Sequence, residues 1–537
     1  MASHFLGIDV GTGSARAGVF DSEGRLAGVA SRPITLYREA GEIVEQSSDE
    51  IWAAVCSACR EALATAGLGA GDIAGMGVDA TCSLVVLGPG GQPLAVGPSD
   101  DPARNIIVWM DHRATDQAHR INATRHRVLD YVGGRISPEM ETPKLLWLLE
   151  NRPETFADAW QFFDLADYLT WRATGSLARS SCTLTCKWTY LAHEGRWDPT
   201  YFRQVGLGPL ADEGYARIGT EVVVPGAALG DGLTEQAAVD LGLRAGTPVG
   251  TGLIDAHAGG IGTVGAGGAD DITSTMAYVF GTSSCTMTST TDPVMVPGVW
   301  GPYHSAMVPG LWLNEGGQSA AGAAIERLLA GHPAHEAARA EAKKSGRALP
   351  DFLARAALSR AGQAGEAARL ASTYHVVPEV LGNRAPFADP DTRAVVLGIG
   401  LQDDIGDLVS LYVAAVCGLA YGLRQIIEAQ AANGIVTSRI VVSGGAARGD
   451  LVRQLLADGT RCTVIGPETE EPVLLGAAIL GAVASGAYDD MTGAMARMSR
   501  NAAVYDPAKG EMHHWHETRF ELYQRLHALA REAAAGD

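Results

Sequence analysis

The sequence of 537 residues lacks the motifs of two common nucleotide sites. It has no Walker loop of the form GxxxxGK[ST], and no GxGxxG that opens a helix after a strand. No apolar signal core precedes the first expected strand at residues 5–9, which favours a cytoplasmic protein. Two apolar stretches, residues 408–423 and 473–488, fall short of about 18–20 residues and contain glycine, so we expect buried core helices.

Positive charge is also scarce: the sequence has 41 basic and 61 acidic residues, which give a formal net charge of −20. Such a surface repels nucleic-acid backbones and anionic membranes, so we expect neither as a partner. Backbone dipoles can still bind phosphate groups locally on a negative protein. The length exceeds what one hydrophobic core usually organises, which predicts two large domains.

The eight cysteines show no spacing typical of a disulfide framework. Cys56 and Cys59 form a CxxC inside an expected amphipathic helix, and no second CxxC or histidine pair nearby completes a zinc site. We therefore expect this pair, and likewise Cys182 and Cys186, to pack in the core.

Two strand-and-turn patterns, one in each half, predict an α/β fold that is duplicated around a cleft. Residues 5–21 alternate as two apolar strands around a glycine-rich turn. In the second half, residues 275–280 form a strand that enters a second glycine and hydroxyl turn. A further strand, residues 439–443, leads into Gly444-Gly445-Ala446.

The first turn, residues 9–14 (DVGTGS), joins a carboxylate to glycines and hydroxyl groups. Glycines let the backbone approach a phosphate closely, hydroxyl groups can bond its oxygens, and a carboxylate can hold hydrated Mg²⁺. An ordinary hairpin is the alternative interpretation. The residues with these properties are Gly11, Gly13, Thr12, Ser14 and Asp9.

The second turn, Gly281-Thr282-Ser283-Ser284, offers the same groups from the other half of the chain. Together the two turns would hold the phosphate tail of a nucleotide between two domains. Gly444, Gly445 and Ala446 would then suit the flat approach of an adenosine, although such turns are also common where helices begin.

Asp255 is the candidate general base, because it is an acidic residue in an apolar, glycine-rich segment. Transfer of a phosphoryl group to a sugar hydroxyl needs a carboxylate within hydrogen-bond reach of that hydroxyl. The alternative role for Asp255 is a helix N-cap. The same segment holds one other polar residue, His257, to which the sequence assigns no role.

In chain order, these segments resemble the landmarks of the FGGY carbohydrate kinases. The resemblance covers nearly the whole chain and weakens at one point, where Glu141 replaces the small residue usual in many members. The other segments that carry it are residues 109–113 (WMDHR), 144–151 (KLLWLLEN), 252–260 (GLIDAHAGG), 382–386 (GNRAP) and 443–449 (SGGAARG).

This resemblance implies two actin-like (ribonuclease H-like) ATPase domains of the α/β class, with a catalytic cleft between them. Residues 1–265 would bind sugar and phosphate, residues 266–490 would bind the nucleotide, and residues 491–537 would form a helical tail. It also implies that Asp255 is the catalytic base and that Asp9 helps to hold Mg²⁺. The nucleotide phosphates would meet Gly281 and Thr282, and the adenosine would meet residues 444–446.

Within the family, two segments resemble the ribulokinase branch. Residues 78–87 (VDATCSLVVL) are similar to a stretch typical of D-ribulokinases, and residues 315–319 (EGGQS) together with Lys187 resemble positions where L-ribulokinases contact their ketose. The implied sugar-binding residues are Thr81, Cys82, Asp111, Lys187, Asp255 and Glu315. Structural alternatives remain for four of them: a core position for Cys82, a salt bridge with Arg113 for Asp111, a surface ion pair for Lys187 and a hydrogen-bond acceptor for Glu315.

We therefore expect ATP-dependent phosphorylation of D-ribulose to D-ribulose 5-phosphate. L-ribulose, D-xylulose and a pentitol or tetritol are the alternative substrates. A non-kinase actin-like ATPase and a catalytically silent sugar-binding regulator are the alternatives from other classes. A homodimer is one assembly that the sequence allows.

Overall fold

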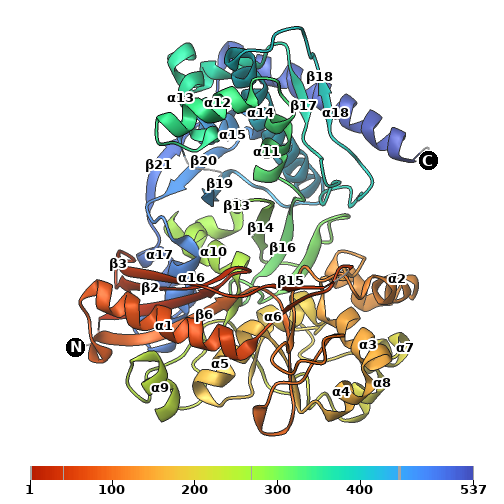
Figure 1. Cartoon of the computed structure of the whole chain (residues 1–537), viewed down its shortest axis with the longest axis vertical. Coiled ribbons are helices and arrows are strands. Elements are labelled where there is room, and N and C mark those ends of the chain that lie inside the picture. The colour runs from red at the N-terminus through yellow and green to blue at the C-terminus, as the bar shows by residue number, and fades with distance from the viewer. Residues whose placement is uncertain (1–2, 40, 268, 446–448, 536–537) are drawn as a thin grey trace.

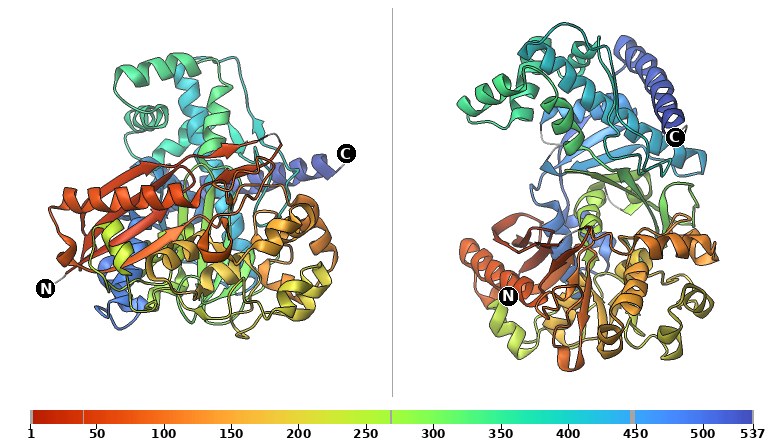
Figure 2. Two further views of the ribbon diagram at one scale, coloured as in Figure 1. Left: turned by 60° about the horizontal axis from the view of Figure 1, so that its bottom comes forward. Right: turned by 45° about the vertical axis from the view of Figure 1, so that its right-hand side comes forward.

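The computed structural model describes residues 3–39, 41–267, 269–445 and 449–535. The chain forms two lobes, with most of the first half in one lobe and most of the second half in the other (Figures 1 and 2). Each lobe is built on a mixed β-sheet with helices packed against it. The predicted two-domain α/β class is therefore confirmed.

The first lobe has a five-stranded sheet of order β12-β6-β1-β2-β3. The hairpin β1–β2 is antiparallel, and β6 and β12 run parallel to β1. These strands are β1 (His4–Val10), β2 (Ser14–Asp21), β3 (Leu26–Pro33), β6 (Ile73–Ala80) and β12 (Leu253–Ile254).

The second lobe repeats this order within a seven-stranded sheet, β15-β16-β14-β13-β19-β20-β21. Its hairpin β13–β14 corresponds to β1–β2, and β19 and β20 run parallel to β13 as β6 and β12 do to β1. The predicted duplication is thus visible in the topology. The strands are β13 (Thr275–Phe280), β14 (Ser284–Thr290), β15 (Trp300–His304), β16 (Trp312–Gln318), β19 (Arg439–Ser443), β20 (Thr463–Pro467) and β21 (Asn501–Tyr505).

Helices and smaller sheets complete both lobes. The helices of the first half are α1 (Ser48–Ala66), α2 (Thr115–Ala123), α3 (Glu141–Asn151), α4 (Pro153–Asp158), α5 (Leu165–Thr174), α6 (Ser181–Lys187), α7 (Pro199–Val205), α8 (Gly208–Asp212), α9 (Glu235–Leu241) and α10 (Asp255–Val264). Those of the second half are α11 (Gly322–Ala330), α12 (His335–Lys344), α13 (Leu349–Ala361), α14 (Ile405–Ala432), α15 (Asp450–Thr460), α16 (Pro472–Ala484), α17 (Met491–Met498) and α18 (Gly510–Ala535). The short strands are β4 (Tyr37–Arg38), β5 (Val44–Gln46), β7 (Leu84–Leu87), β8 (Ile106–Ile107), β9 (Gln161–Asp164), β10 (Arg179–Ser180), β11 (Val222–Val223), β17 (His375–Val377) and β18 (Val395–Leu397).

Helix α16 comes from the second half of the sequence but packs on the first sheet (Figure 1). Glycines allow this approach, because a Cβ on Gly7 would lie 2.0 Å from the carbonyl oxygen of Leu474, and one on Gly77 would lie 2.1 Å from that of Ala477. On its other side α16 meets α10, where Gly476 contacts the carbonyl of Ala258. The pair α10–α16 therefore ties the end of the chain's second half to the lobe that holds Asp255.

The residues after 490 contain the helices α17 and α18, as expected of a helical tail, and between them a strand that the sequence did not predict. Strand β21 pairs with β20 and so extends the second sheet. Helix α18 packs on the same lobe, where Glu517 accepts two hydrogen bonds from Arg424 of α14. The tail looks helical in the sequence because the pairing of β21 depends on a partner some 40 residues away.

The long apolar segment that begins near residue 405 forms α14, which is longer than expected. In the described residues, α14 is the one helix long and apolar enough to cross a membrane, and 78% of its most apolar window is buried. It packs against β17, α13 and α15 of the second lobe, as a core helix does.

Candidate active site

A cavity of about 380 Å³ receives side chains from both halves of the chain. Because parallel strands end at the same edge of a sheet, residues distant in sequence meet there. Trp109, Trp300 and Val473 add apolar walls. The predicted site residues that line it are Asp9, Gly11, Thr12, Thr81, Cys82, Lys187, Asp255, Gly281, Thr282 and Glu315.

Three carboxyl groups meet where the parallel strands of the first sheet end. Asp9 of β1 stands beside Asp79 of β6, and Asp255 begins α10 directly after β12. Burial, followed by the charge of Asp9, raises the pKa of Asp255 to about 6. The same two causes raise the pKa of Asp79 well above its ordinary value. Asp255 is therefore still an available proton acceptor at neutral pH.

Arg16 supplies the positive charge beside these carboxyl groups. Its Nε donates to Oδ2 of Asp9 at 2.8 Å, and its Nη1 donates to Glu471 at 2.6 Å. Both hydrogen bonds from Arg16 to Asp9 go to Oδ2, so neither occupies Oδ1. Mg²⁺ is commonly held by one or two carboxylates, several waters and substrate phosphates, and this donor set fits such an ion.

Each glycine turn is closed by a backbone hydrogen bond from its first glycine, which reaches three residues ahead in the first turn and two in the second. In the first, the N–H of Gly11 donates to the carbonyl of Ser14 at 3.0 Å; in the second, the N–H of Gly281 donates to that of Ser283 at 2.9 Å. The carbonyl of Thr282 also accepts the N–H of Ala321 at 2.9 Å, which fixes the second turn to the start of α11. Thr12 is fixed in turn, because its Oγ1 accepts from Trp109 at 3.0 Å.

Lys187 and Glu315 form a charged part of the cavity wall, and both are at least 94% buried. Burial alone would raise the pKa of Glu315, but the charge of Lys187 and a hydrogen bond with His257 lower it to about 2. Lys187 also lies 5.2 Å from the centre of the Trp300 ring. A buried carboxylate and a buried ammonium on one wall can bind several hydroxyl groups of a small sugar.

His257 is buried behind Glu315 and was given no role by the sequence. Its Nε2 lies 3.3 Å from Oε2 of Glu315, and its Nδ1 lies 3.1 Å from the sulfur of Cys182. Burial alone would lower the pKa of His257, but Cys182 and Glu315 raise it. Burial would raise the pKa of Cys182, but Cys186 and His257 lower it. The imidazole thus contacts Glu315 through one ring nitrogen and Cys182 through the other.

Asp111 is not among the residues that line the cavity, so its contact with the sugar stays a prediction. Arg113 binds both of its carboxylate oxygens, and Oδ2 also accepts the backbone N–H of Val44 at 2.6 Å. Arg113 is held further by Glu45 at 2.9 Å. All three charged groups are fully buried, so Asp111 takes the structural role that the sequence left open.

Four other predicted residues lie beside the cavity and not on its wall. Gly13 and Ser14 complete the first turn, where the carbonyl of Gly13 accepts the N–H of Ile34. Gly444 and Gly445 follow β19, and a Cβ on Gly444 would lie 2.4 Å from the carbonyl of Phe280. These glycines therefore adjoin the second turn. Ala446 lies outside the described residues.

Sequence reasoning missed several charged residues of the wall. Arg16 follows the first turn on β2, and its position opposite Asp9 in the hairpin was a usable signal. Glu139 lies 3.5 Å from His112, and Arg384 lies 5.6 Å from the centre of the Trp300 ring. Glu139 and Arg384 come from loops, for which the sequence offers no periodicity. Glu141 is a structural exception in the same region, because it pairs with buried Lys144 at 3.3 Å.

The cavity brings the carboxylate of Asp255 together with a glycine turn from each of the two actin-like sheets. This combination is typical of enzymes that transfer a phosphoryl group to a hydroxyl. The comparisons with known proteins then give the family. Models of the N-terminal and C-terminal domains of the FGGY family of carbohydrate kinases match residues 4–262 and 276–485. The chain therefore belongs to the FGGY family and is a sugar kinase.

Relatives agree with this assignment, and a solved structure shares the fold. An FGGY carbohydrate kinase domain-containing protein of Homo sapiens is 44% identical over 532 residues, covering 97% of this chain and 96% of that protein. A D-ribulokinase of Saccharomyces cerevisiae is 36% identical over 520 residues, covering 91% and 73%. The structure of a ligand-bound xylulose kinase from Lactobacillus acidophilus superposes with a TM-score of 0.80 at 20% identity, covering 99% of each chain.

Proposed function

We propose that this sugar kinase transfers the γ-phosphoryl group of MgATP to the terminal primary hydroxyl of D-ribulose and releases D-ribulose 5-phosphate and ADP. The observation that carries the proposal is the position of Asp255 on the cavity wall, together with the glycine turns of both sheets. The likeness to a protein named D-ribulokinase supports the choice of this ketose.

In the proposed reaction Asp255 accepts the proton of the primary hydroxyl. The hydroxyl oxygen forms a bond to the γ-phosphorus, the bond from that phosphorus to the β–γ bridging oxygen breaks, and ADP leaves with the electron pair. Backbone N–H groups and hydroxyls of the turns at Gly11–Thr12 and Gly281–Thr282 stabilise the charge that spreads over the transferring group. Mg²⁺, bound with ATP beside Asp9, would neutralise phosphate charge.

The buried side chains of Lys187 and Glu315 would bind the sugar, together with Thr81 and Cys82, which line the same cavity. Lys187 donates hydrogen bonds to sugar oxygens, while Glu315 accepts them from hydroxyls. An unpaired buried polar group costs about 1–3 kcal/mol, so a ketose with a wrongly placed hydroxyl binds less well. Stereochemical selection therefore follows from fixed donors and acceptors on one wall.

The test is an ADP-release assay with MgATP and a panel of D-ribulose, L-ribulose, D-xylulose, ribitol and glycerol. We expect kcat/KM for D-ribulose to exceed that of every other member by at least about tenfold, the difference that 1.4 kcal/mol produces. A preference for another sugar would contradict D-ribulose as the substrate and leave the proposed mechanism unchanged.

The same assay separates the two other classes of function. ATP turnover that does not respond to any sugar would favour an actin-like ATPase. A chain that binds D-ribulose in calorimetry without turnover would favour a silent regulator. Either result would contradict the proposed kinase reaction.

A further inference from the structure

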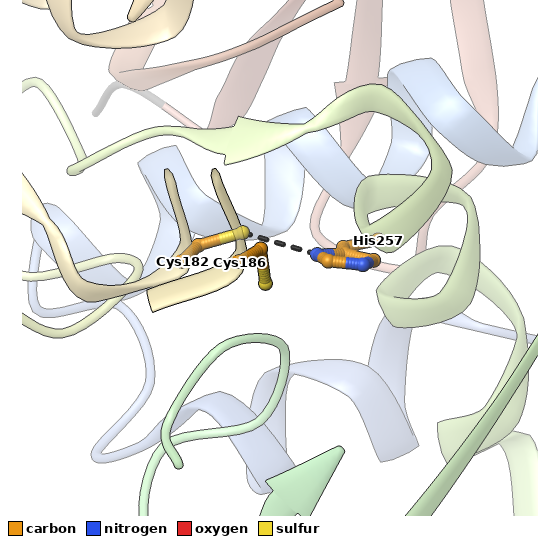
Figure 3. Close-up of side chains that lie close together, drawn as sticks. All are labelled: Cys182, Cys186 and His257. Carbon is orange, nitrogen blue, oxygen red and sulfur yellow. Dashed lines mark hydrogen bonds between the residues drawn. The ribbon is translucent and has the colours of Figure 1, made fainter. Parts of the chain in front are cut away.

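Two cysteines and one histidine lie close together beside Glu315, and Cys182 is hydrogen-bonded to His257 (Figure 3). Cys182 and Cys186 are four residues apart on α6, so both sulfurs lie on one face of the helix. His257 comes from the first turn of α10. Their three potential ligand atoms lie within 4.8 Å of one another, and all three side chains are completely buried.

These distances are close to those that a bound zinc ion imposes. Zn²⁺ binds thiolate sulfur at about 2.3 Å and imidazole nitrogen at about 2.0–2.1 Å, in tetrahedral geometry. Ligand atoms of such a site therefore stand roughly 3.5–3.8 Å apart. The sulfur of Cys182 and Nδ1 of His257 are 3.1 Å apart, so a small outward shift of the side chains admits the ion.

The second ring nitrogen of His257 gives an independent indication. Histidines that bind metal ions almost always donate their other N–H to a carboxylate, a carbonyl or a water. Here Nε2 faces Glu315 at 3.3 Å, so Nδ1 is held toward the sulfur of Cys182. Glu315 and Cys182 thus contact different nitrogens of one imidazole ring.

We propose that Cys182, Cys186 and His257 form a binding site for a thiophilic divalent cation, for which zinc is the physiological candidate. Two thiolates and a neutral imidazole offset the charge of Zn²⁺, so the buried complex has no net charge. Three protein ligands leave the fourth position to a water molecule. This site is distinct from the Mg²⁺ site beside Asp9, whose ligands are oxygens.

The bound ion would join two elements that carry the cavity wall. Helix α6 ends at Lys187, directly after Cys186, and α10 begins with Asp255, two residues before His257. The ion would therefore fix these two helix ends relative to each other and hold Glu315 through the imidazole. Its role is structural, and the proposal does not depend on which sugar the enzyme uses.

The chain contains a matched control in Cys56 and Cys59. This pair is also buried in a helix, α1, at a spacing that often binds zinc. In the described part of the chain, no third cysteine, histidine or acidic side chain joins the pair in a cluster of potential ligands. Replacing these two cysteines removes as much thiol from the protein but leaves the proposed site intact.

The test measures metal content in the full-length chain after removal of any affinity tag. Protein is produced in zinc-supplemented medium, dialysed against metal-free buffer and analysed by inductively coupled plasma mass spectrometry. We expect about one zinc per chain in the wild type and in Cys56→Ser/Cys59→Ser. We expect loss of at least about nine tenths of it in Cys182→Ser/Cys186→Ser, because serine is a poor zinc ligand.

A second measurement needs no variant at the site. Wild-type protein produced with cobalt in place of zinc should show the thiolate-to-cobalt charge-transfer absorption and the strong visible bands of tetrahedral Co²⁺. Wild-type protein without zinc and without these bands would overturn the proposal. Equal zinc content in both double variants would also overturn it, because the ion would then be bound elsewhere.

Discussion

The two sheets have the same strand order but present different chemistry at equivalent positions. In the first sheet, Asp9 stands beside Asp79 of the parallel strand and opposite Arg16 of the hairpin. In the second sheet, Val279 takes the place of Asp9, and its neighbours are Ser443 and Cys285. Two carboxyl groups and a guanidinium group at the end of the first sheet thus correspond to an apolar side chain, a hydroxyl and a thiol at the equivalent positions of the second sheet.

This difference explains how a duplicated fold acquires an asymmetric active site. Both hairpins keep the glycine turn, which only needs backbone N–H groups and close approach to bind phosphate. Among these equivalent positions, carboxyl groups occur in the first sheet alone. We therefore propose that the first lobe binds the metal and accepts the proton, and that both lobes bind the nucleotide.

The largest expected effect comes from replacing Asp255, whose carboxylate is the proposed base. Asp255→Asn preserves size and removes the proton acceptor, so we expect kcat to fall at least about a hundredfold while sugar affinity changes little. Steady-state kinetics with D-ribulose measures both. Asp403→Asn, at an exposed loop position, is the matched control and should behave as wild type.

A smaller effect on activity should follow from replacing Asp9 by alanine. The same replacement at its counterpart Val279 is the comparison. Asp9→Ala removes a carboxylate from the proposed Mg²⁺ site, and we expect the Mg²⁺ concentration for half-maximal activity to rise by about tenfold or more. Val279→Ala should leave this concentration within about threefold. Equal sensitivity of the two variants would contradict the asymmetry of the sheets.

The pH profile sharpens the comparison further, because burial raises the pKa of Asp255 to about 6. Only the ionised carboxylate accepts a proton, so kcat/KM should be constant above this value and fall about tenfold per pH unit below it. Circular dichroism at each pH confirms that the protein remains folded. A fall of kcat/KM only near pH 4, the ordinary range of aspartate, would show that burial does not raise the pKa of the general base.

The smallest effect on turnover should come from the packing of α16, which also distinguishes the sheets. Strands β1 and β6 contain Gly7 and Gly77 where α16 crosses, whereas β13 and β19 contain no glycine. Gly77→Ala would place a Cβ 2.1 Å from a backbone oxygen, and we expect it to lower the free energy of unfolding by about 1–3 kcal/mol. Urea denaturation measures the change.

The matched control for this packing test is Gly208, where the nearest atom to an added Cβ is 3.8 Å away. Gly208→Ala should leave the stability unchanged or raise it slightly, because alanine favours a helix. A Gly77→Ala protein as stable as wild type would show that α16 is free to shift.

Local patterns predicted the strands around the site well. The bounds expected for β13 and β19 match the structure, because each is an apolar strand closed by glycine or a hydroxyl residue. The two glycine turns also followed from short segments. Such features depend on residues adjacent in the sequence.

Features that depend on distant residues could not be predicted in this way. The contact of α16 with β1 joins residues more than 460 positions apart, and that of Cys182 with His257 joins residues 75 apart. Asp111 was assigned to the sugar because its segment is a family landmark, whereas its contacts with Arg113 and Val44 are structural. A landmark thus identifies a fold position without giving its chemical role.

The most direct test of the central claim is a rapid-quench, single-turnover measurement of phosphoryl transfer with saturating D-ribulose and MgATP. It isolates the chemical step from product release, which limits many kinases. The account predicts that this step slows at least about a hundredfold in Asp255→Asn and stays near the wild-type rate in Val279→Ala. An unchanged rate in Asp255→Asn would contradict the assignment of proton transfer to the first lobe.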